Sequence, residues 1–166
     1  MTASKKDLNR RQAASDYLAL FYPFHYRVGF AVEKALRGNT LTQHQTVILW
    51  IIHSEGGSSA SMRRKDIETR ITAWFDLTSS AVSKALRSLA REDLRLLSIT
   101  EDPRSGREKL VTLTREGERH IEAMVQRSED VILRIIENMS PEEIRSGIRM
   151  LSRIVDETLR LENRQD

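Results

Sequence analysis

Short hydroxyl and cationic side chains share one face of a predicted helix near the middle of the chain. Thr78 is a good N-cap residue. Val82, Leu86 and Leu89 follow at helical spacing and define the buried face, so the polar side chains point outward. The outward residues are Ser79, Ser80, Ser83, Lys84 and Arg87, and positions 80, 83, 84 and 87 form one stripe. Hydroxyls permit close approach to base edges and phosphates, and the cations supply charge, so the stripe suits nucleic-acid binding; a solvated helix face is the alternative.

A second group of cations lies between two predicted short strands. Residues 96–99 and 110–113 alternate in the manner of strands, and the long turn between them has no apolar side chain to bury. This turn carries Arg104, Arg107 and Lys109, and an arginine at a hairpin tip suits a narrow minor groove; a solvated loop is the alternative. The residues that we assign to DNA binding are Arg63, Thr78, Ser79, Ser80, Ser83, Lys84, Arg87, Asp102, Arg104, Arg107 and Lys109.

Other site chemistries have little support in the sequence. The chain contains no cysteine, which excludes a disulfide framework, a thiolate zinc site and a cysteine nucleophile. No two of its four histidines, His25, His44, His53 and His120, have the i, i+4 spacing of a helical metal site. There is also no glycine-rich phosphate loop and no nucleophile elbow. We therefore expect neither an enzyme nor a cofactor or metal.

Composition and charge narrow the class of protein. The chain has 166 residues, of which 39% are hydrophobic and 31% charged, as in a mostly helical globular domain. No apolar run approaches the ~20 residues that a membrane-spanning helix needs, and the polar residues 1–11 do not resemble a signal peptide, so we expect a cytoplasmic protein. The net charge of +3 conceals an asymmetry, because residues 1–60 and 61–110 each carry +3 and residues 111–166 carry −3. This is a mild signal for a polyanionic partner.

The apolar periodicity predicts six helices and two strands. The first helix covers residues 8–36 and is broken or kinked by Pro23, and Thr42 begins the second. Ser61 caps a third helix over residues 62–74, Thr78 the fourth, Thr114 begins the fifth, and Ser140 begins the sixth, which ends near Asn163. Three helices followed by a hairpin predict a mainly α winged helix-turn-helix fold with flanking dimerisation helices. The predicted boundaries are 1–38 for the N-terminal dimerisation helix, 41–117 for the DNA-binding domain and 118–166 for the C-terminal dimerisation helices.

Two segments carry a family resemblance. Residues 102–117, DPRSGREKLVTLTREG, resemble the wing signature D-x-R-x-x-R-x-K-L-V-x-L-T-x-x-G of the MarR family of bacterial transcription regulators. Residues 78–89, TSSAVSKALRSL, resemble the recognition helix of that family. Three features depart from the family pattern: the extra residues Thr72–Asp76, Glu68 in place of a small apolar residue, and Asp93 where a glycine is usual.

The resemblance implies a sequence-specific transcription regulator, a repressor, that binds a palindromic DNA operator as a homodimer. The amphipathic terminal helices support the homodimer independently, because they lie outside the winged module and need an apolar partner; packing against each other within one chain is the alternative. A different class of function also remains open, in which the winged helix contacts a protein and its basic wing binds an acidic partner. That function predicts neither a steep salt dependence nor a palindromic site.

The resemblance also implies a small aromatic or phenolic effector, bound between the dimerisation helices and the winged module. The residues that would line its site are Phe24, His25, Arg27, Phe30, Trp50 and His53. Arg27 would pair with a carboxylate and the aromatic side chains would enclose a ring. The alternative is that Phe24, Phe30 and Trp50 are ordinary core residues.

Overall fold

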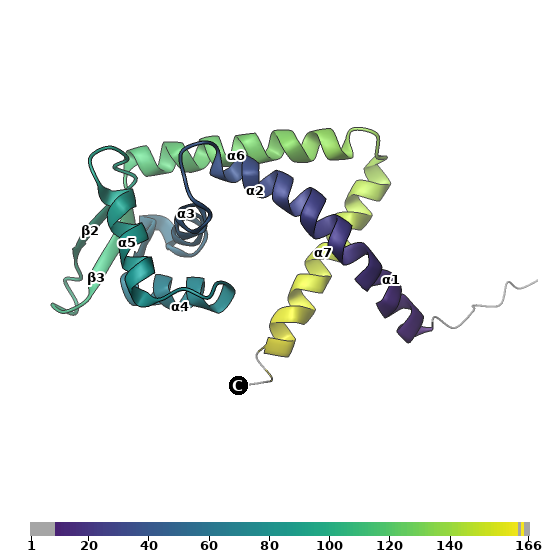
Figure 1. Cartoon of the computed structure of the whole chain (residues 1–166), viewed down its shortest axis with the longest axis horizontal. Helices are drawn as coiled ribbons and strands as arrows, with labels where there is room; N and C mark the ends of the chain where they lie inside the picture. The colour runs from purple at the N-terminus through teal and green to yellow at the C-terminus, as the bar shows by residue number, and fades with distance from the viewer. Residues whose placement is uncertain (1–8, 163, 165–166) are drawn as a thin grey trace, which may run out of the picture. The chain divides into compact units, whose positions relative to one another are not determined.

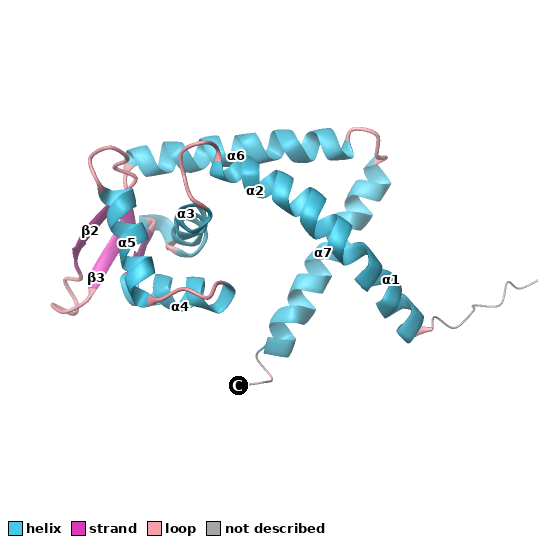
Figure 2. Ribbon diagram, in the orientation of Figure 1, coloured by secondary structure: helices cyan, strands magenta, loops and turns pink. Residues whose placement is uncertain are grey.

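The computed structural model describes residues 9–162 and 164, which belong to two compact units, Met1–Glu129 and Asp130–Asp166. Figures 1 and 2 show the helices and the small sheet. The helices are α1 (Arg10–Pro23), η1 (Phe24–Gly29), α2 (Phe30–Arg37), α3 (Gln43–Glu55), η2 (Gly57–Ser59), α4 (Arg64–Trp74), α5 (Ser79–Ala90), α6 (Arg115–Ile136) and α7 (Pro141–Glu162). The strands are β1 (Ser61–Arg63), β2 (Leu97–Glu101) and β3 (Lys109–Leu113). The predicted outer ends of the first and last helices, Leu8 and Asn163, lie outside the described residues.

The predicted winged helix-turn-helix is confirmed within the first unit, with two corrections. The prediction of a two-stranded hairpin was incomplete, because β1 adds a third strand and the antiparallel order is β1-β3-β2. The predicted N-cap at Ser61 was wrong: Ser61 lies opposite Thr112 in the sheet, and their hydroxyl oxygens are 2.7 Å apart. The third helix therefore begins at Arg64, two residues later than predicted.

Capping residues begin the other helices of this domain as predicted. The side chain of Thr42 accepts a hydrogen bond from the Gln45 backbone N–H, and the Gln45 side chain accepts one from the Thr42 N–H, which completes a capping box. Thr78 accepts from the Ala81 N–H at the start of α5. Thr114 accepts from the Gly117 N–H at the start of α6. Local chemistry thus fixes where α3, α5 and α6 begin.

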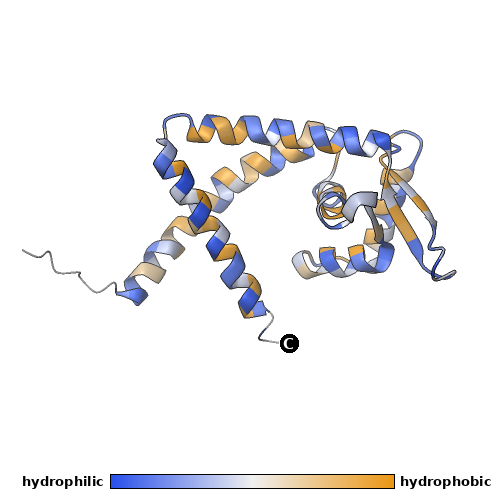
Figure 3. Cartoon of the chain, turned by 180° about the vertical axis from the view of Figure 1, so that it is seen from behind, coloured by the Kyte–Doolittle hydropathy of each residue, from blue (hydrophilic) through white to orange (hydrophobic). Residues whose placement is uncertain are grey.

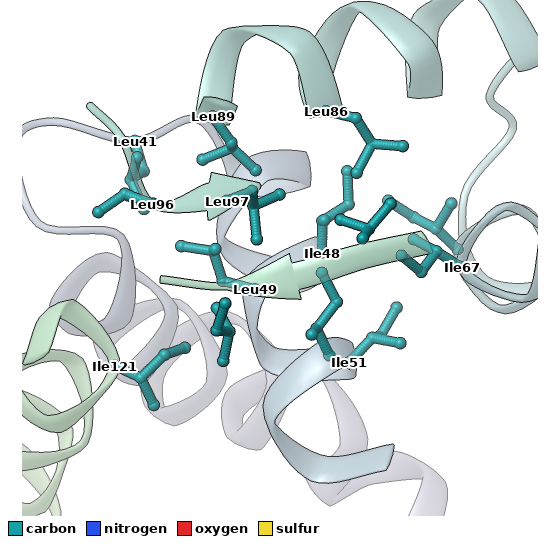
Figure 4. Packing of buried hydrophobic residues seen from close by; sticks show 14 of the residues in the cluster. Leu41, Ile48, Leu49, Ile51, Ile67, Leu86, Leu89, Leu96, Leu97 and Ile121 are labelled. Atoms are coloured by element: carbon teal, nitrogen blue, oxygen red, sulfur yellow. The ribbon is translucent and has the colours of Figure 1, made fainter. Parts of the chain in front are cut away.

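The core of the first unit lies between the three helices of the winged domain, its sheet and the first turns of α6. Ile48 of α3, Ile67 of α4 and Leu86 of α5 are fully or almost fully buried, together with Val111 of β3 and Ile121 of α6. Figure 4 shows the labelled side chains of this cluster directed toward one another from these separate elements. Burying aliphatic side chains of this size contributes about 1.5–3 kcal/mol each, so this shared core holds α5 against the sheet.

The N-terminal helical segment is not broken at Pro23, contrary to one of the two predicted outcomes. Pro23 is the last residue of α1, and the chain continues as one turn of π-helix, η1, directly into α2. A π-helical turn is a known way for a helix to absorb a local irregularity, here beside the proline that lacks a backbone N–H. The segment ends at Gly38, which has a positive φ of 60°.

The second unit contains the end of α6 and the whole of α7. The Ser140 hydroxyl accepts a hydrogen bond from the Glu143 N–H, and the Glu143 carboxylate accepts from the Ser140 N–H, so the predicted capping box is confirmed. The hydrogen bonds from Ser140 lower the pKa of Glu143 below its ordinary value. Hydrophobic and hydrophilic residues alternate along α7 in Figure 3. Within the described residues, no helix is both long and apolar enough to span a membrane.

Candidate nucleic-acid interface

Helix α5 separates buried apolar residues from exposed polar ones. Val82, Leu86 and Leu89 are buried in the core, which orients the opposite side of the helix toward solvent. Of the outward residues, Ser83 is half-buried and the others are exposed: Ser79, Ser80, Lys84 and Arg87. Among the described residues, neither Lys84 nor Arg87 has an ion-pair partner. These two cations remain available for an external anion.

Two of the serines on α5 already make hydrogen bonds. The Ser83 hydroxyl donates to the backbone oxygen of Ser79 at 2.9 Å. The Ser79 hydroxyl accepts from the Arg64 guanidinium of α4 at 3.0 Å. Ser83 is left with acceptor capacity and Ser79 with a donor, so both can still take part in an interface that complements those groups.

Asp102 organises the turn of the wing. Its side chain is only 6% exposed and accepts from Arg63 Nε at 3.0 Å, so it ties β1 to the turn. It also accepts from the backbone N–H of Arg104 at 2.9 Å. The backbone N–H of Asp102 donates to the oxygen of Glu108 at 2.8 Å and closes the turn. Asp102 and Arg63 were both assigned to DNA binding from the sequence, and here they are paired with each other.

The remaining wing cations differ in their surroundings. Lys109 Nζ lies 3.0 Å from a carboxylate oxygen of Glu101, directly across the β2–β3 ladder. Arg104 and Arg107 are exposed on the turn, and neither pairs with a carboxylate in the described part of the chain. The tip of the wing therefore carries two cations without ion-pair partners among the described residues, on a turn that the hydrogen bonds of Asp102 hold in place.

A cleft of about 200 Å³ lies at the surface between α5 and the sheet, and several of the residues assigned to DNA binding line it. Ser83 and Arg87 line it from α5, and Lys109 lines it from β3. Arg64 of α4 also lines this cleft, although the sequence analysis did not assign it. The basic run Arg63-Arg64-Lys65 was the available signal in the sequence. Which of these three side chains faces the cleft could be assigned only once the end of β1 and the start of α4 were known.

The extra residues between the helices of the helix-turn-helix extend α4 and its turn. Thr72–Trp74 form the last residues of α4, and Phe75 follows in an extended conformation. The Phe75 ring packs edge-on against His44 of α3, with 5.1 Å between ring centroids. Trp74 is 60% exposed. The insertion thus anchors the turn to α3 and leaves one large aromatic side chain at the surface.

The residues at the other two positions that differ from the family pattern, Glu68 and Asp93, form ion pairs. Glu68 pairs with Arg64 one turn earlier on α4, with 3.1 Å between Oε2 and Nη2. Asp93 pairs with Arg91 after the end of α5, and the hydrogen bond from Arg91 holds the pKa of the Asp93 carboxyl below its ordinary value. Both carboxylates are therefore neutralised by neighbouring guanidinium groups.

The six residues assigned to an effector fall into separate groups. His25 and Phe30 contact each other edge-on at 5.5 Å, and Trp50 and His53 form a second pair at 5.9 Å. Phe24 and Arg27 are exposed on η1. The alternative, in which Phe24, Phe30 and Trp50 are core residues, is wrong for this chain by itself, because their exposed fractions are 53%, 49% and 40%.

A cavity of about 310 Å³ lies beside Phe30. Glu33, Lys34 and Arg37 of α2 and Gln43 of α3 complete its lining. A ring stacked on Phe30 would have two cations within the same cavity. No group of three or more metal-ligating side chains occurs among the residues that the structure describes.

Comparisons with known proteins agree with this geometry. Residues 41–117 match the family described as the winged helix DNA-binding domain. A MarR family protein from Bacillus stearothermophilus is 20% identical with a TM-score of 0.73, over 92% of this chain and 99% of that one. A mutant of MepR from S. aureus bound to an oligodeoxyribonucleotide is 20% identical with a TM-score of 0.60, over 86% and 97%. BpsR from Bordetella bronchiseptica, whose DNA binding is regulated by 6-hydroxynicotinic acid, is 19% identical with a TM-score of 0.57, over 94% and 98%.

A search of the curated proteins gave no match. The structural similarities extend over most of the chain at low identity, so they establish the fold. The family match is independent of them and covers the segment that contains α3 to β3. Together they support a winged helix DNA-binding domain at residues 41–117, within a fold that this chain shares with solved MarR family proteins.

Proposed function

We propose that this chain, whose residues 41–117 match the winged helix DNA-binding domain and whose fold is that of a solved MarR family protein, represses transcription by binding a palindromic operator as a homodimer. The observation that carries the proposal is the outward face of α5, where Lys84 and Arg87 are exposed and unpaired within the described residues. An α-helix fits the major groove, where hydroxyl and guanidinium groups can distinguish bases. Such a repressor acts where a bacterial chromosome lies, in the cytoplasm.

The wing supplies the part of the affinity that does not depend on sequence. Arg104 and Arg107 project from a turn that Asp102 holds in place, so their charges reach the backbone or the minor groove at a small entropic cost. Contacts of this kind fix the position of the protein on DNA, and base contacts from α5 select the site.

Exposed apolar residues at both ends of the chain support the homodimer. In the first unit, α1, η1 and α2 expose Tyr17, Leu18, Leu20, Phe21, Tyr22, Phe24, Tyr26 and Phe30. In the second unit, α7 exposes Ile148, Met150, Leu151, Ile154, Val155, Leu159 and Leu161. At 3.6 residues per turn the α7 residues form two stripes on different sides of the helix, which favours two apolar partners over one. Patches of this kind on a chain of 166 residues favour association with a second copy.

Selection from a random DNA library tests the operator and the role of α5. We expect an enriched palindrome whose half-sites lie about 10 bp apart, because two recognition helices enter successive major grooves on one side of the duplex. Arg87→Ala should relax one position in each half-site and cost about 1–3 kcal/mol there. Arg119→Ala, which removes an exposed arginine that pairs with Glu116 on α6, is the matched control and should leave the motif unchanged.

The outcomes of this selection separate the proposals. Identical motifs from wild type and Arg87→Ala would exclude Arg87 from base recognition. The absence of any enriched palindrome would favour a protein-binding winged helix with an acidic partner. Sedimentation equilibrium at micromolar concentration tests the dimer, because a single species of 19.1 kDa would refute it.

We further propose that a small aromatic carboxylate relieves repression by binding beside Phe30. The cavity there combines an aromatic side chain with two cations, Lys34 and Arg37, and one carboxylate, Glu33, and this positive balance suits a ring that carries a negative charge. The exposed Arg27 lies on the preceding turn and is a further partner for the carboxylate. Addition of 6-hydroxynicotinic acid should release operator DNA from the wild type and not from Lys34→Ala. Release from both proteins would exclude Lys34, and release from neither would exclude this ligand.

A further inference from the structure

We infer that the cleft between α5 and the wing binds one phosphodiester strand of DNA, and that Arg64 is its innermost phosphate ligand. The inference rests on the proposed function, because it concerns how the same domain holds DNA. Arg64 belongs to neither the recognition helix nor the wing, and it lines the cleft from the start of α4. The consequence is a third contact element in addition to α5 and the turn of the wing.

The geometry of a duplex requires a backbone strand at this place. In B-DNA each sugar–phosphate strand separates a major groove from the neighbouring minor groove. A protein that inserts α5 into the major groove and directs its wing toward the minor groove must therefore let one strand pass between them. The cleft of about 200 Å³ occupies this interval, with Arg87 of α5 on one side and Lys109 of β3 on the other.

The lining of the cleft complements a phosphodiester. Three cations from three different elements face it, namely Arg64, Arg87 and Lys109, together with the hydroxyl-bearing Ser83. The remaining lining residues, Leu86, Ile99 and Val111, are apolar. No carboxylate belongs to this set of lining residues, so an anion that enters meets only positive charge and apolar surface.

Arg64 is held in place before DNA arrives. Its Nη2 atom donates to the Ser79 hydroxyl at 3.0 Å and to Glu68 Oε2 at 3.1 Å. The Arg64 side chain is 39% exposed, so the guanidinium held by Ser79 and Glu68 is still accessible to a phosphate oxygen. The contact to Ser79 also fixes the first turn of α5 relative to α4.

Two carboxylates moderate the charge of the cleft from outside it. Glu68 pairs with Arg64, and Glu101 pairs with Lys109. A phosphate must compete with these carboxylates for the same cations. Removing the charge of Glu68 should therefore strengthen DNA binding, whereas removing Arg64 should weaken it.

The experiment measures the affinity for operator and random-sequence duplexes between 50 and 200 mM salt. Loss of one phosphate contact lowers the slope of log K against log [salt] by about 0.9, so the penalty of Arg64→Ala should be about 3.5-fold larger at 50 mM than at 200 mM. The penalty should be equal for both duplexes, because a phosphate contact carries no sequence information. Glu68→Gln should bind both duplexes roughly threefold more tightly, as expected for release of one partly exposed ion pair.

Arg70→Ala is the matched control. Arg70 lies on the same helix and pairs with Glu55 at 2.8 Å, outside the cleft, so its removal changes the net charge equally without removing a phosphate ligand. An Arg64→Ala slope equal to that of Arg70→Ala would overturn the inference, as would a penalty confined to the operator. If Arg64→Ala does not fold, Glu68→Gln decides, because unchanged or weaker binding by that variant also overturns the inference.

Failure of the inference is distinguishable from failure of the proposed function. If the wild-type protein shows no salt-dependent binding to either duplex, the DNA-binding function itself is refuted. If the wild type binds both duplexes but the Arg64 and Glu68 variants show the same affinity and salt dependence as Arg70→Ala, the DNA-binding function stands. The backbone strand then lies outside this cleft.

Discussion

Asp102 provides a test in which simple charge counting and the structure predict opposite results. Asp102 is an acidic residue on the wing, so its removal should strengthen DNA binding if only net charge matters. Its buried carboxylate, however, accepts hydrogen bonds from Arg63 Nε and from the backbone N–H of Arg104. We therefore expect Asp102→Ala to weaken DNA binding, because the turn that presents Arg104 and Arg107 loses its anchor.

The expected magnitude follows from these contacts. Hydrogen bonds that involve a charged group contribute about 1.5–3 kcal/mol each. The free energy of local opening is small in exposed loops, so loss of these bonds is enough to disorder the turn. An unanchored wing should lose the phosphate contacts that we propose for Arg104 and Arg107, and two contacts correspond to a fall of about 1.8 in the slope of log K against log [salt]. The penalty of Asp102→Ala should then be about twelvefold larger at 50 mM than at 200 mM salt.

Fluorescence anisotropy with a labelled random-sequence duplex measures this effect, and Glu101→Ala is the matched control. Glu101 carries the same charge one residue earlier on the hairpin, but it is exposed and pairs only with Lys109 among the residues described. Its removal should strengthen binding slightly. Tighter binding by both variants would refute the reasoning, since it would mean that Asp102 acts through its charge alone.

Two further predictions concern stability. Burial and the charge of Arg127 lower the pKa of His120 from 6.5. Folding therefore favours the neutral imidazole, and the free energy of unfolding should fall as the pH drops below 6.5, less so in His120→Gln; equal falls in urea titrations would contradict this. Gly117→Ala should cost about 2–3 kcal/mol in the same assay, because its Cβ would lie 2.2 Å from the Leu96 backbone oxygen, whereas Gly106→Ala, in open space, should be nearly neutral.

The features predictable from the sequence were those that depend on neighbouring residues. The caps at Thr42, Thr78 and Ser140 each use a side chain and a backbone N–H about one turn away, so they can be predicted from the local sequence without knowledge of the fold. Strand β1 was not predictable in this way. Its three residues are too few to show alternation, and its partner Thr112 lies far along the chain from Ser61.

The candidate site likewise has a part that local sequence predicts and a part that it does not. The stripe on α5 follows from helical periodicity, and the wing from its cations and turn residues. Whether a particular charge is available to DNA depends instead on contacts that periodicity does not encode. Arg63 and Arg64 are adjacent and chemically identical, yet one is bound to Asp102 in the wing and the other lines the cleft.

The distribution of ion pairs over the winged domain bears on specificity. Two cations that line the cleft have carboxylate partners, as Arg64 has Glu68 and Lys109 has Glu101. The cations on the outer face of α5 and at the tip of the wing, such as Arg87 and Arg104, have none among the described residues. Backbone contacts add affinity for every sequence equally, so carboxylates that moderate them lower non-specific binding more than they lower discrimination. A modest net charge of +3 is then consistent with a DNA-binding protein whose affinity is concentrated at the side chains that we propose to contact the grooves.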